Sequence, residues 1–482
     1  MKFSDSSSPD RMGTDPLWKL LLEFSIPAII MMVFNMLYSV VDAAFLGWAL
    51  PDGSGVAVVT LAQPVMTILM AFPMLAGQGG SALGAIQLGR GDKPIVERTL
   101  GNTTFLLITM AAVVAVIAFI FIDPLLTLLA TPADIWDQTR IFVQIICVGS
   151  VFQCLGMGLN NFLRVAGKPN LSLATSVLGT VMCIVFNYLL VILLGWGVAG
   201  SAIATLLGMC CGMVPVIWYF VAAKTAPFHL RLSCCRPELR LMGQICMLGL
   251  ASFAMQCAQV VTSLIFNEVV TKYGAMDAIC ETGALAAVGV AFRSMMVTFC
   301  PLIGITMGAQ PIIGYNYGAR NWQRVLDIFK MATWLGIGLG AFFFAFCHLA
   351  PEVIVSLFGL NGNLADYAAN CVVIMSAFLP LVGFQIVGSN YFQASGQPIK
   401  AAVLGLTRQV LFLIPLYMFA PPIFASWFGY SELLGVVTCV PAADILSVAF
   451  TAGFVAYEVK KLRDLRDGRR TEVSRSKTGV EV

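Results

Sequence analysis

Charged residues are scarce in this sequence. Asp, Glu, Lys and Arg make up 11% of its 482 residues, whereas hydrophobic residues make up 59%; an ordinary soluble domain has about 25% charged residues. So little charge excludes a soluble fold of this length, and it also excludes a disordered chain, which is rich in charge. The apolar residues suffice for roughly a dozen membrane-crossing helices of about 20 residues each. The sequence therefore predicts an all-α polytopic membrane protein.

Motifs for catalysis and nucleotide binding are missing as well. The chain has two histidines and contains no P-loop, no zinc-protease motif and no nucleophile elbow. Its 14 cysteines lack the spacing of a metal or disulfide site, and a net charge of +3 is too small to indicate nucleic-acid binding. We therefore expect neither an enzyme nor a cofactor, metal or nucleic-acid site.

The basic residues predict the orientation of the chain, because Lys and Arg concentrate in cytoplasmic loops. Twelve apolar runs are long enough to be spans. With the loops numbered in chain order, 25 of the 28 basic residues fall in the tails and even-numbered loops, Arg164 and Arg408 among them. The odd loops hold Arg140 and Lys272, and Arg293 falls within a span. We predict twelve spans in a cell inner membrane, with both termini cytoplasmic.

A repeat divides the spans into two sets. N-F-L-R-V-A-G-K-P from Asn161 matches N-Y-F-Q-A-S-G-Q-P from Asn390, and Gly89 matches Gly318 at the same offset of 229. Two loops that keep one offset indicate a duplicated six-span unit, as in alternating-access carriers. The predicted parts are an N-terminal tail (1–15), an N-lobe (16–222), a cytoplasmic linker (223–241), a C-lobe (242–458) and a basic C-terminal tail (459–482).

Asp42 is the most conspicuous charge in the first span, because a carboxylate at mid-bilayer costs a few kcal/mol. Asn35, Tyr38 and Asp42 form one helical stripe, and Pro27 earlier in the run allows a kink. A polar stripe with a hinge below it is typical of an ion-coupled carrier. The alternative is that Asp42 lies solvated at the outer interface.

Further polar residues lie within the apolar runs. Glu268, Asp444 and Arg293 are ionisable residues of the second half, and each could serve function or form a structural pair. Asn187 could be an ion ligand or a hydrogen-bonding contact between helices. Methionines such as Met66 pack in cores, although polarisable side chains of this kind also suit a cavity for varied ligands.

Several segments resemble those of the MATE (multidrug and toxic compound extrusion) transporters, in the DinF-type, MepA-like branch. They are L-L-E-F-S-I-P-A-I-I from Leu21, N-M-L-Y-S-V-V-D-A-A-F-L-G from Asn35, the motif from Asn161, and G-Y-N-Y-G-A-R from Gly314. The resemblance implies an antiporter that exports cationic, amphipathic compounds in exchange for H⁺ or Na⁺ by alternating access.

The resemblance also implies roles for single residues. Asp42 matches the first-span carboxylate that binds the coupling ion, and Pro27 matches the proline at which that helix bends. Polar positions of the N-lobe cavity are matched by Asn35, Tyr38, Asn160 and, more loosely, Thr205.

The fifth span departs from the branch pattern N-x-x-x-D-P. Cys183 and Asn187 stand at the two polar positions, so the N-lobe keeps one carboxylate rather than two. A single charge serves a chelated Na⁺ less well, which favours H⁺ at Asp42. A partnership with Glu268 or Asp444 would weaken this preference.

Two other classes of transporter compete with this interpretation. A lipid-linked oligosaccharide flippase of the same wider superfamily would need cationic residues in its cavity to hold pyrophosphate, and few basic residues fall within the spans. A major-facilitator carrier would need a G-x-x-x-D-R-x-G-R-R-like loop, which the segment after Gly89 lacks. We therefore expect a monomeric antiporter for small organic cations, embedded in the lipid bilayer.

Overall fold

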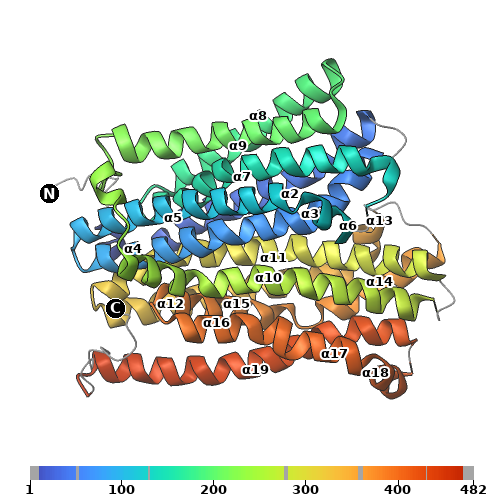
Figure 1. Cartoon of the computed structure of the whole chain (residues 1–482). Helices are drawn as coiled ribbons and strands as arrows, with labels where there is room; N and C mark the ends of the chain where they lie inside the picture. The colour runs from blue at the N-terminus through green and yellow to red at the C-terminus, as the bar shows by residue number, and fades with distance from the viewer. Residues whose placement is uncertain are drawn as a thin grey trace.

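A computed structural model describes residues 10–49, 54–128, 131–275, 280–356, 362–429 and 431–469. Throughout these ranges the secondary structure is helical, without strands. Helices are what such apolar runs form in a bilayer, because each backbone N–H and C=O must find its partner within the segment. The long helices lie side by side along one common direction (Figure 1).

The helices of the N-lobe follow one another with short connections. They are α1 (Arg11–Thr14), α2 (Leu17–Ala49), α3 (Ser54–Pro73), the π-helical η1 (Met74–Gln78), α4 (Gly79–Gly89), α5 (Lys93–Ile120), α6 (Ile122–Leu128), η2 (Ala133–Ile135), α7 (Trp136–Val165), α8 (Pro169–Asn187), the π-helical η3 (Tyr188–Leu193) and α9 (Gly197–Ala222).

A connection containing η4 (Leu232–Cys235) leads to the C-lobe. The helices of the C-lobe are α10 (Leu239–Gly274), α11 (Cys280–Gly318), α12 (Trp322–Leu349), α13 (Pro351–Ser356), α14 (Asn363–Ser376), α15 (Leu379–Ala394), α16 (Pro398–Leu406), the π-helical η5 (Thr407–Leu413), α17 (Ile414–Phe419), α18 (Pro421–Phe428) and α19 (Glu432–Arg466).

Twelve spans account for these helices. Within the described ranges, 11 helices are long and apolar enough to cross a membrane, and the pair α14–α15, bent by 47°, forms one more apolar stretch. Asn316 donates to the carbonyl oxygen of Met12 (2.9 Å) and Arg466 donates to Gln323 (3.0 Å), so both described chain ends lie at one end of the bundle. A chain whose two ends lie on the same side crosses the membrane an even number of times, so the bent pair α14–α15 forms a single broken span, the twelfth. We call the end of the bundle that holds both chain ends the basic end.

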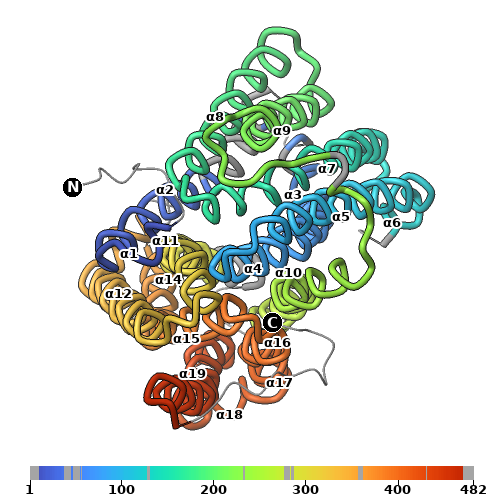
Figure 2. The backbone as a smooth tube through the Cα atoms, turned by 90° about the vertical axis from the view of Figure 1, so that its left-hand side faces the viewer, coloured from blue at the N-terminus to red at the C-terminus, as the bar shows by residue number. Residues whose placement is uncertain are grey.

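The two lobes occupy separate halves of the bundle. Figure 2 looks along the helices and shows α8 and α9 at one edge and α18 and α19 at the other, with α2, α4, α10 and α11 between them. These four central helices carry the contact between the lobes, because α2 packs along α11 and α10 packs along α4. The predicted fold of two six-helix lobes is confirmed.

Equivalent glycines of the two repeats face each other at the basic end. A Cβ atom added to Gly89 would lie 1.9 Å from the carbonyl oxygen of Tyr315, and one added to Gly318 would lie 2.0 Å from that of Ile86. No residue with a side chain fits such a distance without a shift of the backbone, so glycine is required at both positions. The offset seen in the sequence therefore marks a two-sided contact between the lobes.

A second pair of equivalent glycines supports the same arrangement. A Cβ atom at Gly308 of α11 would lie 2.7 Å from the backbone nitrogen of Ser25 in α2, and one at Gly79 of α4 would lie 2.1 Å from the carbonyl oxygen of Ile245 in α10. Each lobe therefore brings its first long helix against a small-residue surface of the other lobe.

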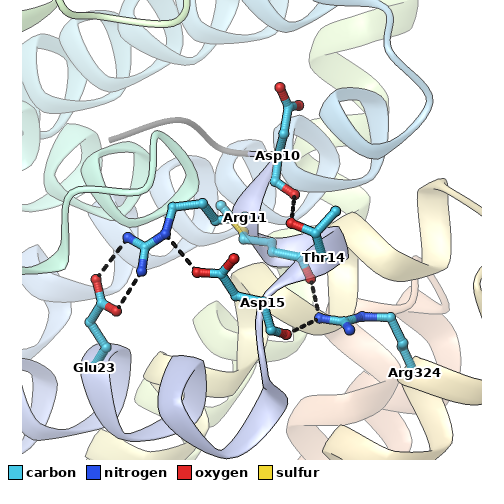
Figure 3. Close-up of polar contacts among 7 residues, drawn as sticks. Asp10, Arg11, Thr14, Asp15, Glu23 and Arg324 are labelled. Atoms are coloured by element: carbon cyan, nitrogen blue, oxygen red, sulfur yellow. Dashed lines mark hydrogen bonds and ion pairs between the residues drawn. The ribbon is translucent and has the colours of Figure 1, made fainter. Parts of the chain in front are cut away.

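The N-terminal segment ties the lobes together at the basic end (Figure 3). Arg324 of α12 donates to the carbonyl oxygens of Met12 (3.1 Å) and Asp15 (2.7 Å). Arg11 forms a two-pronged contact with Glu23 (3.2 and 3.0 Å) and donates to Asp15 (2.8 Å). The hydrogen bonds to Glu23 raise the pKa of the Arg11 guanidinium above its ordinary value, while partial burial opposes them. Arg324 of the C-lobe thus fixes the N-terminal segment, which leads into the first helix of the N-lobe.

Candidate functional site

The predicted polar stripe lies on α2. Its helix continues through Tyr38 and Asp42, but their side chains lie outside those that the structure describes. Asn35 is exposed. Pro27 is buried within one uninterrupted helix, so the predicted bend corresponds to no break in α2. The roles assigned to these four residues stay predictions.

Asn160 joins three helices of the N-lobe. Its side chain is 7% exposed, and its amide nitrogen donates to the hydroxyl of Ser176 (2.9 Å) and the carbonyl oxygen of Ser172 (3.3 Å) on α8. The same nitrogen lies 3.7 Å from the sulfur of Met31 on α2. The face of α2 that carries Met31 therefore borders both Asn160 of the N-lobe and Met307 on α11 of the C-lobe.

The fifth and sixth spans supply further polar groups that carry no charge. Asn187 donates from its amide nitrogen to the carbonyl oxygen (3.2 Å) and the sulfur (3.4 Å) of Cys183, and that sulfur lies 3.9 Å from the hydroxyl of Thr205. All three side chains are buried. We call Asn160, Cys183, Asn187 and Thr205 the N-lobe polar core.

Met66 lies apart from this core. It packs from α3 against a buried cluster that includes Leu69, Phe142 and Cys147. This environment is that of a core methionine, and its predicted role in a cavity stays a prediction.

The three ionisable residues predicted for the C-lobe lie in different environments. Glu268 on α10 and Arg293 on α11 are exposed, and neither forms an ion pair in the part of the chain that the structure describes. Asp444 on α19 is only 3% exposed. The structure therefore brings one of the three into a buried site and leaves two at the surface of the helices.

The partner of Asp444 is Arg408, on the π-helical η5. The guanidinium Nε donates to a carboxylate oxygen of Asp444 over 2.6 Å, and the Arg408 side chain is 18% exposed. Its guanidinium carbon lies 5.3 Å from the centre of the Phe299 ring on α11. We call Arg408, Asp444 and Phe299 the C-lobe ion-pair site.

The assignment of Arg408 to a cytoplasmic loop is wrong. The helical segment starts at Pro398, so Arg408 lies about 15 Å along it, near the middle of a span. Arg164, counted with another loop, is also only 4% exposed and donates to the side chain of Asn161. A basic residue ten positions after a helix-starting proline is the signal that sequence analysis missed.

The repeat equivalent of Arg164 is Gln393, which joins a polar contact between the lobes. Gln393 donates to the hydroxyl of Ser252 (2.9 Å) and to the carbonyl oxygen of Leu248 (3.2 Å) on α10. Ser252 in turn donates to the side-chain oxygen of Gln78 in the N-lobe (3.0 Å). The same repeat position therefore holds a buried cation in one lobe and an interlobe amide in the other.

A protein-family comparison agrees with this arrangement of two lobes. The MatE family model matches the chain twice, over residues 27–189 and 251–419, once in each lobe. The chain belongs to the MatE family. MATE proteins are membrane transporters and not enzymes, which confirms the class expected from the sequence.

The chain is similar over most of its length to individual MATE proteins. It is 24% identical to the multidrug export protein MepA of Staphylococcus haemolyticus, over 92% of this chain and 94% of that protein. It is 23% identical to MepA of Staphylococcus aureus strain MRSA252, over 89% and 93% of the two chains. These relatives fit the MepA-like branch that the sequence resembles.

Solved structures share the fold. An outward-facing multidrug resistance MATE transporter of the MOP superfamily superposes with a TM-score of 0.86 at 21% identity, covering 96% of this chain and 99% of the other. A MOP superfamily transporter from Pyrococcus furiosus, described as having reverse polarity of its binding pocket, gives 0.84 at 20% identity, covering 97% and 100%. At these identities the likeness establishes the MATE fold.

Proposed function

We propose that this MATE protein is a secondary active antiporter that exports cationic, amphipathic drugs and other toxic organic compounds. The full-length similarity to proteins named as multidrug exporters is the observation that carries the proposal. The duplicated lobes suit alternating access, in which the lobes rock about a site near the membrane midplane. The sequence has no P-loop, which leaves an ion gradient or passive transport, and we propose an ion gradient as the driving force.

Asp42 is the proposed site of ion coupling. Met31 turns one face of α2 toward Asn160 in the N-lobe. Asp42 follows Met31 by about three helical turns, so helical periodicity assigns both positions to the same face. The position of Tyr38 follows by about two turns on this face as well. The register of α2 therefore assigns the positions of Tyr38 and Asp42 to the stripe that includes the buried Met31 and the exposed Asn35.

H⁺ is the proposed coupling ion, in preference to Na⁺. The four residues of the N-lobe polar core supply amide, hydroxyl and thiol groups, and none of them is a carboxylate that could join Asp42. In the C-lobe the charge of Asp444 is already compensated by Arg408, and Glu268 is exposed. A single carboxylate can bind and release a proton, whereas Na⁺ needs several oxygen ligands at once.

We further propose that the basic end faces the cytoplasm of a cell whose inner membrane holds the protein. The positive-inside rule supports this orientation, because the tails and the connections at this end carry most of the basic residues. Under this proposal, the contact between the lobes at the basic end closes the protein toward the cytoplasm.

The ion pair between Arg408 and Asp444 bears on the alternative of a lipid-linked oligosaccharide flippase. Arg408 adds a cation within a span, as a pyrophosphate site would require, but Asp444 neutralises its charge. A free cationic surface for a lipid-linked pyrophosphate is therefore not what this pair provides.

Transport into proteoliposomes with an imposed pH or Na⁺ gradient tests the proposal. Purified wild-type protein should accumulate the fluorescent cation ethidium when a pH gradient is applied, and a Na⁺ gradient alone should give little uptake. Asp42→Asn should abolish uptake while leaving expression intact. Asp366→Asn, which neutralises an exposed carboxylate in the first turn of α14, is the matched control and should transport normally. Uptake driven by neither gradient contradicts the antiporter.

A further inference from the structure

We propose that a groove between the lobes, at the basic end, binds a phospholipid whose headgroup carries a primary ammonium, as phosphatidylethanolamine does. The lipid is bound as a structural ligand and is not transported, so the inference concerns neither the exported compounds nor the coupling ion. It stands independently of the proposed function, because the contacts that carry it lie on the outer surface of α2 and α12.

The groove lies where α2 of the N-lobe packs against α12 of the C-lobe. It has a volume of about 780 Å³, within the range of about 300–1,000 Å³ that is usual for ligand sites. Leu21 and Leu22 line it from α2, and Met331 and Leu335 line it from α12. Because α12 lies at the outer edge of the bundle (Figure 2), the groove opens toward the membrane.

Polar and apolar groups are separated along the groove. Arg324 donates to the carbonyl oxygen of Asp15, so it marks the level on α12 at which α2 begins. Asp327 and Lys330, which line the groove, follow Arg324 by about 5 and 9 Å along the helix, and Trp334 follows by about 15 Å. The charged groups therefore lie nearer the basic end and the apolar groups lie deeper. A phospholipid places its headgroup and acyl chains in the same order.

Two tryptophans, one from each lobe, flank the groove. Trp18 of α2 is 63% exposed and Trp334 of α12 is 69% exposed, although both are large aromatic side chains. Tryptophan concentrates at the interface between membrane and water, because its ring is apolar and its indole N–H is polar. This pair therefore places the groove at the level of the lipid headgroups.

The two charged groups of the groove remain available to a ligand. Asp327 and Lys330 lie three positions apart on α12, a spacing at which opposite charges commonly pair. Within the described ranges no ion pair joins them, and Asp327 instead accepts from the amide nitrogen of Gln323 (2.9 and 3.0 Å). A carboxylate has more acceptor sites than these hydrogen bonds fill, and the side chain of Lys330 is exposed.

The signs of these charges select the headgroup. The ammonium of Lys330 can bind the lipid phosphate, and the carboxylate of Asp327 can accept hydrogen bonds from a primary ammonium. An anionic headgroup without an ammonium would bring a second negative charge to Asp327. A choline headgroup carries the positive charge but has no N–H group to donate. Phosphatidylethanolamine complements both residues.

A lipid in this groove would also act on the contact between the lobes. One wall of the groove belongs to each lobe, so the ligand binds best when α2 and α12 lie together as they do here. A ligand favours the arrangement to which it binds more tightly. The contact of Gly89 and Gly318 lies at the same end of the bundle. The bound lipid should therefore stabilise that contact.

Native mass spectrometry of the purified, delipidated full-length protein tests the headgroup. Phosphatidylethanolamine should bind about fivefold more tightly than phosphatidylcholine with identical acyl chains, as one exposed charged contact allows. Phosphatidylglycerol should also bind more weakly than phosphatidylethanolamine. In Asp327→Asn/Lys330→Gln the two affinities of ethanolamine and choline lipids should agree within about twofold. The control Arg98→Gln/Glu238→Gln neutralises another exposed pair (3.7 Å) and should keep the preference.

The tryptophans provide a second test, which leaves the charges in place. Trp18→Ala/Trp334→Ala should weaken the binding of ethanolamine and choline lipids by the same factor, because it removes apolar contacts that both lipids share. Trp218→Ala is the matched control. Trp218 on α9 is also 63% exposed but lies outside the groove, so both affinities should stay at their wild-type values.

Hydrogen–deuterium exchange tests the effect on the lobes. In nanodiscs that contain phosphatidylethanolamine, residues 84–92 and 312–322 of the wild type should exchange more slowly than in nanodiscs of phosphatidylcholine alone. In Asp327→Asn/Lys330→Gln the two nanodiscs should give the same exchange. Exchange that does not depend on the lipid in the wild type would overturn the proposed stabilisation of the contact.

Each binding result has a definite meaning. Equal affinities for ethanolamine and choline lipids in the wild type overturn the inference, as does a preference that survives in Asp327→Asn/Lys330→Gln. Tighter binding of phosphatidylglycerol shows an anionic lipid as the occupant and overturns the assigned headgroup. Unchanged affinities in Trp18→Ala/Trp334→Ala show only the general contact of lipid with a membrane protein and overturn the groove as a site. The ethidium assay decides the proposed export separately from all of these.

Discussion

The N-lobe and the C-lobe repeat one six-span unit, but they bury different polar groups. The N-lobe polar core consists of neutral amide, hydroxyl and thiol groups, whereas the C-lobe holds an arginine–aspartate pair. The fifth and eleventh spans start at the equivalent residues Pro169 and Pro398, yet α8 runs for 19 residues before its π-helical segment and α16 runs for only 9. The contact surface between the lobes has kept its symmetry while their interiors have diverged.

The largest effect on stability is expected when only one partner of the Arg408–Asp444 ion pair is replaced. Arg408→Gln should lower the free energy of unfolding by about 3–5 kcal/mol, because it leaves the carboxylate of Asp444 buried without a partner. The double variant Arg408→Gln/Asp444→Asn should recover most of this loss. Unfolding in detergent measures both. Equal destabilisation by the single and double variants would show that the charge of Asp444 is not what makes Arg408 necessary.

The next largest effect is expected at the contact between the lobes, where Gly89 and Gly318 lie against the backbone of the opposite lobe. Gly89→Val and Gly318→Val each force a side chain into the backbone of the other lobe, which should weaken the contact at the basic end by about 1–3 kcal/mol. The two variants should speed hydrogen–deuterium exchange in residues 84–92 and 312–322 to the same degree. Gly338→Val, where a Cβ atom meets nothing within 4 Å, should leave exchange unchanged. Unequal responses to the two variants would contradict a symmetric contact.

A smaller effect is expected in the neutral core. Asn160→Ala removes the hydrogen bonds to Ser176 and Ser172 and should cost about 1–2 kcal/mol of unfolding free energy. Ser176→Ala, which removes one of these partners, should cost less. Thermal unfolding of the two variants measures the difference, and a cost for Asn160→Ala as large as that for Arg408→Gln would erase the distinction between the lobes.

The smallest effects are expected at the exposed ionisable residues. Glu268→Gln and Arg293→Gln should each change the unfolding free energy by less than about 0.5 kcal/mol, because each residue lies six positions from the end of its span, where a long charged side chain can reach the membrane interface. Ethidium uptake driven by a pH gradient should persist in Glu268→Gln. Its loss in a well-folded variant would place a coupling carboxylate in the C-lobe and reopen the choice between H⁺ and Na⁺.

Much of the fold could be predicted because a bilayer imposes strong constraints. Length and hydropathy identify the spans, and the repeat of Gly89 at Gly318 identifies two lobes whose equivalent residues turn out to be in contact. The N-lobe polar core was accessible in part, because Asn160, Asn187 and Thr205 interrupt apolar runs. Their hydrogen-bond partners depend on how three helices pack, which no local pattern specifies.

The C-lobe pair shows where prediction from sequence fails. Asp444 is conspicuous as an acid within a span, but its partner depends on the depth at which Arg408 lies. That depth depends on where the helix starts, at Pro398, and on the π-helical segment that follows it. Neither feature leaves a pattern of apolar residues in the sequence by which the depth could be predicted. Counting basic residues near the ends of spans therefore places Arg408 outside the membrane. Arg164 is different, because it lies in the last turn of α7, at the end of its span, where the sequence places it, although its side chain is buried.

The glycine contact at the basic end has the form of a homodimer interface. Gly89 meets the carbonyl oxygen of Tyr315, and Gly318 meets that of Ile86, where Ile86 and Tyr315 are themselves repeat equivalents. In a twofold interface, residue i of one copy contacts residue j of the other, and j contacts i in return. A single six-span unit, inserted twice in the same orientation, could have assembled through this surface before the two genes were joined. In a single chain, the interior of each half can differ while the surface that pairs the two halves is kept.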